Sequence, residues 1–339
     1  MSEIRILTYN IFMRPYCVSH VGGDYKTSRL RLIMKELDYF DVVCFQEAFD
    51  FFTHRKFMLI EYAQQHGFKY FVSSQPCDFS RPFLADSGLL ILSRHPIVEG
   101  HFDSFGQGVQ SDSLAEKGVL YARIQHGNTF INVFSTHTQA SYYSDNPADT
   151  YPSFHKRASQ LVSLKKFIET TLELRSAQNE MSFLVGDMNV NAHNANYPIE
   201  LIRDCLDVTG SSLEVFQSCR NEYELMATIL NNPKGVYSFR DVYLHFNDKH
   251  GVTFGDCEEV DGTLLPGENI LTHPVDHRSM QFLDYIFEIS RRGQEPIVDL
   301  KKVNIEKFKT DQHYKVKQLS DHYGVSITFS PKDAAVNGA

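Results

Sequence analysis

The chain lacks the residues and patterns that mark several classes of protein. None of its 339 residues is tryptophan, and its six cysteines are scattered without a C-x-x-C pair. Dispersed cysteines in so long a chain do not predict a disulfide scaffold, and Cys44, in the apolar run DVVCF, is expected to be a buried, reduced thiol. No run of eighteen apolar residues is present, so no membrane-spanning helix is predicted.

The sequence also lacks a signal-peptide pattern and has fewer basic than acidic residues. The segment MSEIRILTYN lacks the basic and apolar stretches of a signal peptide, so we expect a cytoplasmic or peripheral membrane protein. A chain whose signal peptide had been removed would read the same way and would be secreted. Asp and Glu (42) outnumber Lys and Arg (33), giving a formal net charge of −9. This balance argues against nonspecific nucleic-acid binding, which needs basic side chains to neutralise phosphates, but it leaves room for a local basic site.

Short strand-like runs recur along the chain, rich in β-branched and aromatic residues and bounded by turn residues. They read IRILTYN, DVVCFQE, KYFVSS, SGLLILS, GVLYARI, TFINVFSTH, MSFLVGD, QFLDYIFE and YGVSITF. This pattern predicts strands. Several runs are apolar almost throughout, which is typical of strands buried on both faces.

Helical periodicity appears between the runs, over residues 28–40, 54–67 and 155–176. With β-hairpins expected between about 86 and 136, the alternation predicts two sheets packed face to face and covered on their outer sides by helices. The polar stretch from about 207 to 280 is predicted to be a long, loop-rich elaboration. We expect a single catalytic domain over 1–330 and a disordered tail over 331–339.

Polar side chains stand at or near one end of six of the apolar runs. They are Asn10, Glu47, His137, Asp187 with Asn189, Asp284, and Asp321 with His322. Each has an ordinary explanation: a lone strand-end carboxylate is solvated, a lone histidine packs or faces water, and GDMNVN suits an Asx-rich turn. Because six runs share the feature, we expect these ends to meet at a cleft between packed layers.

The chemistry open to such a set is narrow. Carboxylate and amide oxygens are hard ligands that suit Mg²⁺ or Mn²⁺ rather than Zn²⁺. A histidine paired with a buried carboxylate is oriented and becomes a better base. A metal, an oriented His–Asp pair and amide donors together indicate phosphoester hydrolysis.

The runs also resemble, in the right order, the motifs of the endonuclease/exonuclease/phosphatase superfamily. The matching segments are ILTYNIF, DVVCFQE, SGLLILSRHPI, STHTQA, GDMNVNA, FLDYIF and LSDHYGV, spread over roughly residues 4–329. Within the superfamily, SGLLILSRHPI and THTQA are most similar to the magnesium-dependent neutral sphingomyelinases. The resemblance implies a four-layer α/β sandwich of two mostly antiparallel sheets flanked by helices, in agreement with the pattern of runs.

The resemblance also implies roles around a metal and a phosphate. Glu47 would be the main metal ligand, Asn10 would line the metal and phosphate site, and Asp321 would lie near the metal. Asp187 and Asn189 would sit against the scissile phosphate, with Asp187 activating or positioning the attacking water.

Proton transfer and a switch are implied in the same way. His137 would bind or protonate the phosphate, and His322, oriented by Asp284, would act as general base or acid. In eukaryotic neutral sphingomyelinases an Asp five residues before a Lys–Gly pair forms a switch that completes the site. Asp112 and Lys117 have this spacing, although a solvated loop explains them equally well.

Three alternatives remain open at this point. Abasic-site endonucleases share GDMN-type and SDH motifs, but they usually carry Tyr-x-Pro-Asn where this chain has STHTQA. Inositol-polyphosphate 5-phosphatases show a Pro-Ala-Trp-Cys-Asp-Arg-type motif where this chain reads MQFLDYIF. A catalytically dead binding protein would tend to lose Glu47 or His322, and both are present.

The predicted partner is therefore a phospholipid at a membrane surface, with no nucleic acid, and the sequence predicts no oligomeric state. We expect sphingomyelin, or a close phosphocholine lipid, to be hydrolysed by direct attack of water. Secreted haemolytic members insert a Trp-containing aromatic hairpin, and this chain has no Trp. Aromatic substitutes are the segments 141–154 and 235–246, in which we expect most rings to be core residues.

Overall fold

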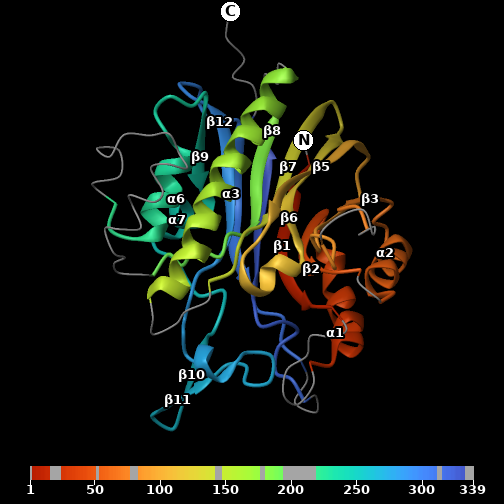
Figure 1. The fold of residues 1–339 in the computed structure, drawn as a ribbon. Coiled ribbons are helices and arrows are strands. Elements are labelled where there is room, and N and C mark those ends of the chain that lie inside the picture. The colour runs from red at the N-terminus through yellow and green to blue at the C-terminus, as the bar shows by residue number, and fades with distance from the viewer. Residues whose placement is uncertain are drawn as a thin grey trace, which may run out of the picture.

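The protein is built as two six-stranded sheets packed face to face, with helices on the outer faces (Figure 1). The computed structural model describes residues 2–15, 24–50, 53–76, 83–141, 147–175, 180–193, 219–310 and 315–332. The four-layer α/β sandwich expected from the sequence is confirmed.

The first sheet joins the two ends of the chain. Its strands, in order across the sheet, are β13 (Val298–Glu306), β14 (Gly324–Pro331), β1 (Ile4–Met13), β2 (Val42–Ala48), β4 (Leu90–Ser93) and β3 (Tyr70–Ser73). The β1–β2 pair is parallel and the other four pairings are antiparallel.

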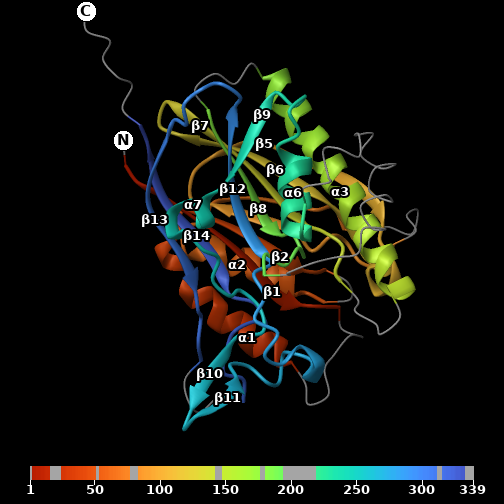
Figure 2. The same ribbon diagram turned by 90° about the vertical axis from the view of Figure 1, so that its left-hand side faces the viewer.

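The second sheet holds the middle of the chain. Its order is β5 (Ile97–Gln107), β6 (Glu116–His126), β7 (Thr129–His137), β8 (Met181–Asp187), β12 (Asp284–Arg291) and β9 (Tyr237–Asp241). Here β7–β8 is the parallel pair, and the predicted hairpins between 86 and 136 are present. A separate hairpin, β10 (Cys257–Val260) and β11 (Thr263–Pro266), extends away from the sandwich (Figure 2).

The core between the sheets is mostly apolar, with a polar bridge at Gln46. Fully buried side chains from both sheets meet there, among them Ile6, Val42, Val133 and Val185. The buried amide of Gln46 donates to the Ser135 hydroxyl at 3.2 Å and accepts from Thr8 Oγ1 at 3.3 Å. A buried polar group is tolerated when its hydrogen bonds are satisfied, so Gln46 links the sheets beside the strand ends that carry the site.

The outer helices seal the other faces of the sheets. Helix α1 (Lys26–Ile33) continues as the 3₁₀ turn η1 (Met34–Tyr39) and, with α2 (Arg55–Gln65), packs on the first sheet. Helices α3 (Pro147–Leu174) and α6 (Glu222–Leu230) pack on the second. Among the described residues, no helix is long and apolar enough to cross a bilayer.

Three predictions about the elements are wrong in detail. Helix α3 begins eight residues before the predicted start and contains Pro152, although an internal proline removes a helical hydrogen bond. The stretch from about 207 to 280, predicted to be loop-rich, has more regular structure than expected: its described part contains α6, β9, α7 (Val242–Asn247) and the β10–β11 hairpin. Strand β13 was not predicted because its lysines face outward at a sheet edge, a common protection against edge pairing.

Most of the described rings of the two aromatic segments are buried or partly buried. Phe154, Tyr237 and Phe239 are buried, whereas Phe246 is 44% exposed. Residues 142–146, and the expected tail from 333 onward, lie outside the described residues. Cys44 is buried and has a free thiol, as expected, and the thiol of Cys257 is also free.

Candidate active site

Three adjacent strands of the second sheet bring their polar ends into register. His137 at the end of β7 pairs with Asp187 at the end of β8, which in turn pairs with Asp284 at the start of β12. Side chains directly opposite one another on neighbouring strands lie on the same face of a sheet. The apolar strand ending in GD therefore presents Asp187 between a histidine and a second carboxylate, all three of them buried.

The first sheet adds Asn10 and Glu47 from the opposite side. The Asn10 amide Nδ2 donates to Asp187 Oδ2 at 3.0 Å and to Glu47 Oε1 at 3.1 Å. One amide thus joins carboxylates from both sheets. The second Glu47 oxygen, Oε2, is buried and has no hydrogen-bond partner among the described residues.

Two glycines, Gly186 and Gly88, allow neighbouring backbone to approach closely beside the site. Gly186 has a φ of 138°, and a Cβ there would overlap the Thr136 carbonyl oxygen on β7. Gly88 has a φ of 66°, and a Cβ there would lie 3.1 Å from the Glu47 Cα. Glu47 itself has a φ of 57°, unusual for a residue with a side chain, and such backbone strain clusters at functional sites.

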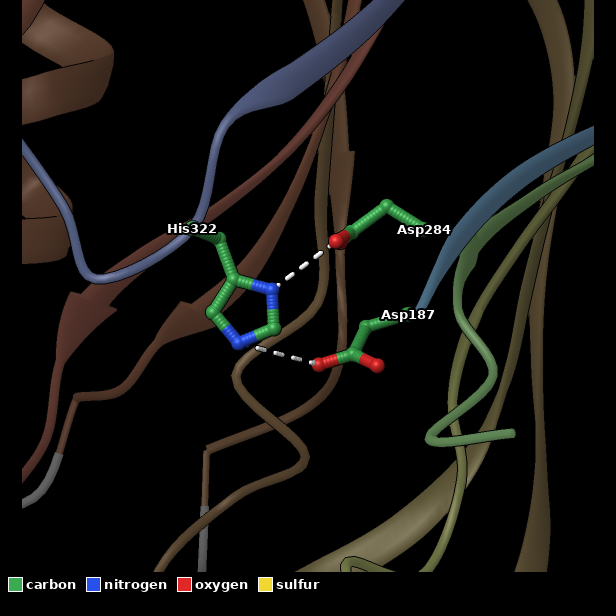
Figure 3. A group of neighbouring side chains, drawn as sticks. All are labelled: Asp187, Asp284 and His322. Carbon is green, nitrogen blue, oxygen red and sulfur yellow. Dashed lines mark hydrogen bonds and ion pairs between the residues drawn. The ribbon is translucent and has the colours of Figure 1, made fainter. Parts of the chain in front are cut away.

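His322 and Asp284 form a hydrogen-bonded pair at the centre of the site (Figure 3). His322 Nδ1 lies 2.9 Å from Asp284 Oδ2, so its Nε2 points towards Asp187 Oδ2, at 3.7 Å. Burial alone would lower the pKa of His322, but the nearby carboxylates of Asp284 and Asp187 outweigh it and raise that pKa well above its ordinary value. The Ser320 hydroxyl fixes the loop by donating to the Asn10 carbonyl at 2.7 Å.

His137 lies on the other side of Asp187 from His322, and its pKa is shifted in the opposite direction. Its Nε2 is 3.6 Å from Asp187 Oδ2, and its Nδ1 is buried without a hydrogen-bond partner in the described part of the chain. Burial, assisted by the charges of Lys117 and His322, lowers the pKa of His137 well below its ordinary value. Two imidazoles with opposite proton preferences therefore flank one carboxylate, a pattern typical of acid–base sites.

Two aspartates of the site, Asp187 and Asp321, are buried carboxyl groups. Burial raises the pKa of both Asp187 and Asp321, and the Glu47 charge raises that of Asp321 further. Asp187 also accepts the Asn189 backbone N–H at 2.9 Å. A bound cation would stabilise such a cluster, and the oxygens available suit a hard divalent ion.

A cavity of about 360 Å³ opens onto these groups. Seven of the predicted site residues line it: Glu47, Asp112, Lys117, His137, Asp187, Asn189 and His322. The other three, Asn10, Asp284 and Asp321, stand outside the lining and contact it through hydrogen bonds or charge. The structure therefore brings all ten predicted residues together.

The Asp112–Lys117 pair forms part of the cavity wall. Lys117 Nζ lies 3.4 Å from Asp112 Oδ2, and that oxygen also accepts the Ala140 N–H at 2.7 Å. Asp112 stands in the 3₁₀ turn η2 (Gln110–Leu114), while Lys117 is buried on β6. Asp112 and Lys117 therefore form an ion pair, and Lys117 is buried rather than solvated.

Buried polar residues connect this part of the cavity wall to α3 through hydrogen bonds. Gln139 accepts the Val109 N–H at 2.8 Å through its Oε1, while its own backbone N–H donates to Gln160 Oε1 at 2.7 Å. Arg157 donates to the Gln139 carbonyl at 2.6 Å and pairs with Glu222. The turn that carries Asp112 is therefore tied to the second sheet's covering helices.

We expect Lys117→Ala and Asp112→Ala to impair activity to a similar extent, with little further loss in the double variant. Two partners that act as one unit show coupling in a double-mutant cycle. The measurement is kcat/KM for the four proteins of the cycle, with their unfolding midpoints as a check on the fold. Additive losses would contradict a joint role.

Some residues around the site carry no sequence signal. Arg29, which reads as an exposed cation in RLRLIMKEL, is buried and donates to the carbonyls of Asp24, Ile11, Phe12 and Leu319. It thereby holds the end of β1 against the loop before His322. Phe254 and Asp276 also line the cavity, and neither belongs to any motif that we singled out.

Comparison with known proteins gives a consistent result. A family model described as the Endonuclease/Exonuclease/phosphatase family matches residues 7–287. A sphingomyelinase of Dictyostelium discoideum is 31% identical over 341 residues, covering 86% of this chain and 71% of that protein. A sphingomyelinase C of Bacillus cereus is 29% identical, covering 57% of this chain and 58% of that protein, which is less than two thirds of its length.

Solved structures share the fold. Beta toxin from Staphylococcus aureus superimposes with a TM-score of 0.63 at 20% identity, covering 96% of this chain and 99% of the toxin. A variant of the same toxin with bound magnesium ions gives a TM-score of 0.61 at 18% identity, with the same coverage.

Proposed function

The chain belongs to the Endonuclease/Exonuclease/phosphatase family and is a phosphoric diester hydrolase, and from this premise we propose that its substrate is sphingomyelin or a close phosphocholine lipid. The products would be ceramide, or its analogue, and phosphocholine. The observation that carries the proposal is Asp187 flanked by His137 and by the His322–Asp284 pair at the base of a cavity with an apolar wall. The relatives named sphingomyelinase support the choice of substrate.

We propose that water is the nucleophile. Each of the two histidines faces a carboxylate rather than a hydroxyl or a thiol, so neither is arranged to activate a serine or cysteine. Asp187 would position the water, and His322, held by Asp284, would transfer a proton at its Nε2. His137 would bind or protonate the phosphate from the other side, and Asn189 would sit against the same phosphate.

A divalent metal fits the residues present. Glu47 Oε2 is a buried carboxylate oxygen without a partner among the described residues, and Asp321 and Asn10 lie beside Glu47. We propose that these residues hold Mg²⁺, for which Mn²⁺ can substitute, and the toxin structure with bound magnesium ions supports this assignment. The metal would neutralise phosphate charge as it develops in the transition state.

The cavity wall favours a lipid over a polyanion. Phe49, Leu84 and Leu114 line one side, and Leu84 and Leu114 are 55% and 50% exposed at its rim. Among the described residues that line the cavity, two are lysine or arginine, Arg14 and Lys117. Lys117 is already paired with Asp112. DNA or a polyphosphorylated inositol would call for several cations, so we place this enzyme at a lipid surface as a peripheral protein.

The test is a comparison of substrates with one enzyme preparation. Sphingomyelin in mixed micelles with Mg²⁺ is expected to release phosphocholine, while an abasic DNA duplex and an inositol 4,5-bisphosphate lipid are expected to give at most trace turnover. Strong activity on either of the latter, with none on sphingomyelin, would overturn the substrate and leave the metal-dependent phosphoesterase in place. No activity on any substrate would favour a binding protein.

A further inference from the structure

One wall of the cavity has no role in the proposed reaction. It is formed by Phe254, Asp276, Gln281 and Leu283. Reciprocal backbone hydrogen bonds fix it: Phe254 N donates to the Gln281 carbonyl at 3.0 Å, and Gln281 N to the Phe254 carbonyl at 2.8 Å. The Phe254 ring lies 5.0 Å from the His322 ring, centroid to centroid, so this wall adjoins the reacting centre.

Asp276 brings a carboxylate to the same wall. It ends the 3₁₀ turn η3 (Pro274–Asp276), is half-buried, and forms no ion pair with Lys or Arg among the described residues. Burial raises the pKa of this carboxyl, and His273 and His277 only partly oppose the shift. Asp276 is thus a partly desolvated carboxyl in the cavity lining, without a Lys or Arg partner among the described residues.

The other walls are poorly suited to a positively charged group. Lys117 occupies the η2 side, and Arg14 lies over the Phe12 ring, 4.2 Å from its centroid, on the β1 side. Beside Phe49, Leu84 and Leu114, the nearby carboxylates are Asp112, which is paired with Lys117, and Glu47, which we assign to the metal. The wall with Phe254 and Asp276 combines an aromatic ring with a carboxylate that has no Lys or Arg partner among the described residues and that we do not assign to the metal.

We propose that Phe254 and Asp276 form the subsite for the quaternary ammonium group of the substrate, and that this subsite sets head-group specificity. The inference rests on the proposed function, which places the scissile phosphate beside His322. In a choline ester the ammonium stands two carbons beyond the phosphate oxygen, within reach of a ring that touches His322. An aromatic face and a carboxylate both attract such a cation, and the attraction grows when water is excluded.

The subsite can be tested with two soluble esters that differ in one atom. p-Nitrophenyl phosphocholine carries the ammonium, and p-nitrophenyl 3,3-dimethylbutyl phosphate replaces the nitrogen with carbon, so shape is kept and charge is lost. The natural enzyme is expected to prefer the choline ester by roughly 3- to 30-fold in kcat/KM, the range of a cation–π contact.

Asp276→Asn and Phe254→Leu are expected to bring this preference, the ratio of kcat/KM for the choline ester to kcat/KM for the dimethylbutyl ester, close to one, because only the choline ester carries the ammonium that they attract. A merely structural role would lower both esters together, and that result, like an unchanged preference, would overturn the subsite. Val275→Ala is the matched control, because Val275 precedes Asp276, is 79% exposed and does not line the cavity. It should keep the preference of the natural enzyme.

Failure of the subsite and failure of the proposed function give different results. An enzyme that cleaves sphingomyelin but treats the two esters alike would refute the subsite alone. An enzyme that cleaves bis(p-nitrophenyl) phosphate but neither sphingomyelin nor the choline ester would refute the proposed function, and the subsite with it.

Discussion

Replacing His322 with alanine is expected to lower kcat by about 10²- to 10⁴-fold, the usual contribution of a positioned proton-transfer group. The imidazole Nε2 faces Asp187 across the base of the cavity while Nδ1 is held by Asp284, so the alanine variant loses the imidazole that Asp284 orients. The measurement is steady-state hydrolysis of sphingomyelin and of p-nitrophenyl phosphocholine, with circular dichroism to show that the fold is intact.

Asp284→Asn should also lower kcat, because an amide cannot stabilise the charged imidazole as a carboxylate does. His250 provides a matched control, since it forms a similar buried pair with Asp241, at 2.8 Å, and does not line the cavity. His250→Ala should lower the unfolding midpoint and leave kcat within about threefold. A folded His322→Ala enzyme within threefold of the natural one would refute the role of His322.

The strand ends were predictable because two simple signals coincide there. Runs such as MSFLVGD are apolar because their strands are buried on both faces, and a carboxylate at the end of such a run stands out. That His137, Asp187 and Asp284 would lie side by side could not be predicted from these runs. It depends on β12 pairing with β8 across almost a hundred residues of chain, and local patterns do not encode strand order.

The residues that sequence reasoning missed act through tertiary contacts. Arg29 looks like any helical surface cation until four backbone carbonyls are seen to surround its guanidinium. Phe254 and Asp276 lie in a stretch predicted to be loop, and they reach the cavity because Phe254 pairs with Gln281 just before β12. The Asp112–Lys117 spacing was visible, but only burial of Lys117 separates an ion pair from a solvated loop.

A large loss of metal affinity is expected on replacing Glu47. This residue ends the DVVCFQE motif, and its buried Oε2 has no hydrogen-bond partner among the described residues. Glu47→Gln keeps the size of the side chain, and its remaining oxygen can still accept from Asn10, but the charge at Oε2 is lost. Loss of a supporting group around a metal typically costs about 10- to 100-fold in affinity, so loss of a direct ligand charge should cost at least as much.

We therefore expect the Mg²⁺ concentration for half-maximal activity to rise by about 10-fold or more in Glu47→Gln, and EDTA to abolish activity of the natural enzyme. Binding of Mn²⁺, followed by its electron paramagnetic resonance signal, reports the same loss without turnover. Glu268→Gln is the control: Glu268 is a buried glutamate whose oxygens accept backbone N–H groups from Asn269, Ile270 and Lys317, and it does not line the cavity. Its replacement should lower stability and leave the metal requirement unchanged, because both Glu268 oxygens already accept backbone N–H groups, whereas Glu47 Oε2 has no partner among the described residues. Full activity in metal-free buffer, or an unaltered metal requirement in Glu47→Gln, would remove Glu47 from the metal site.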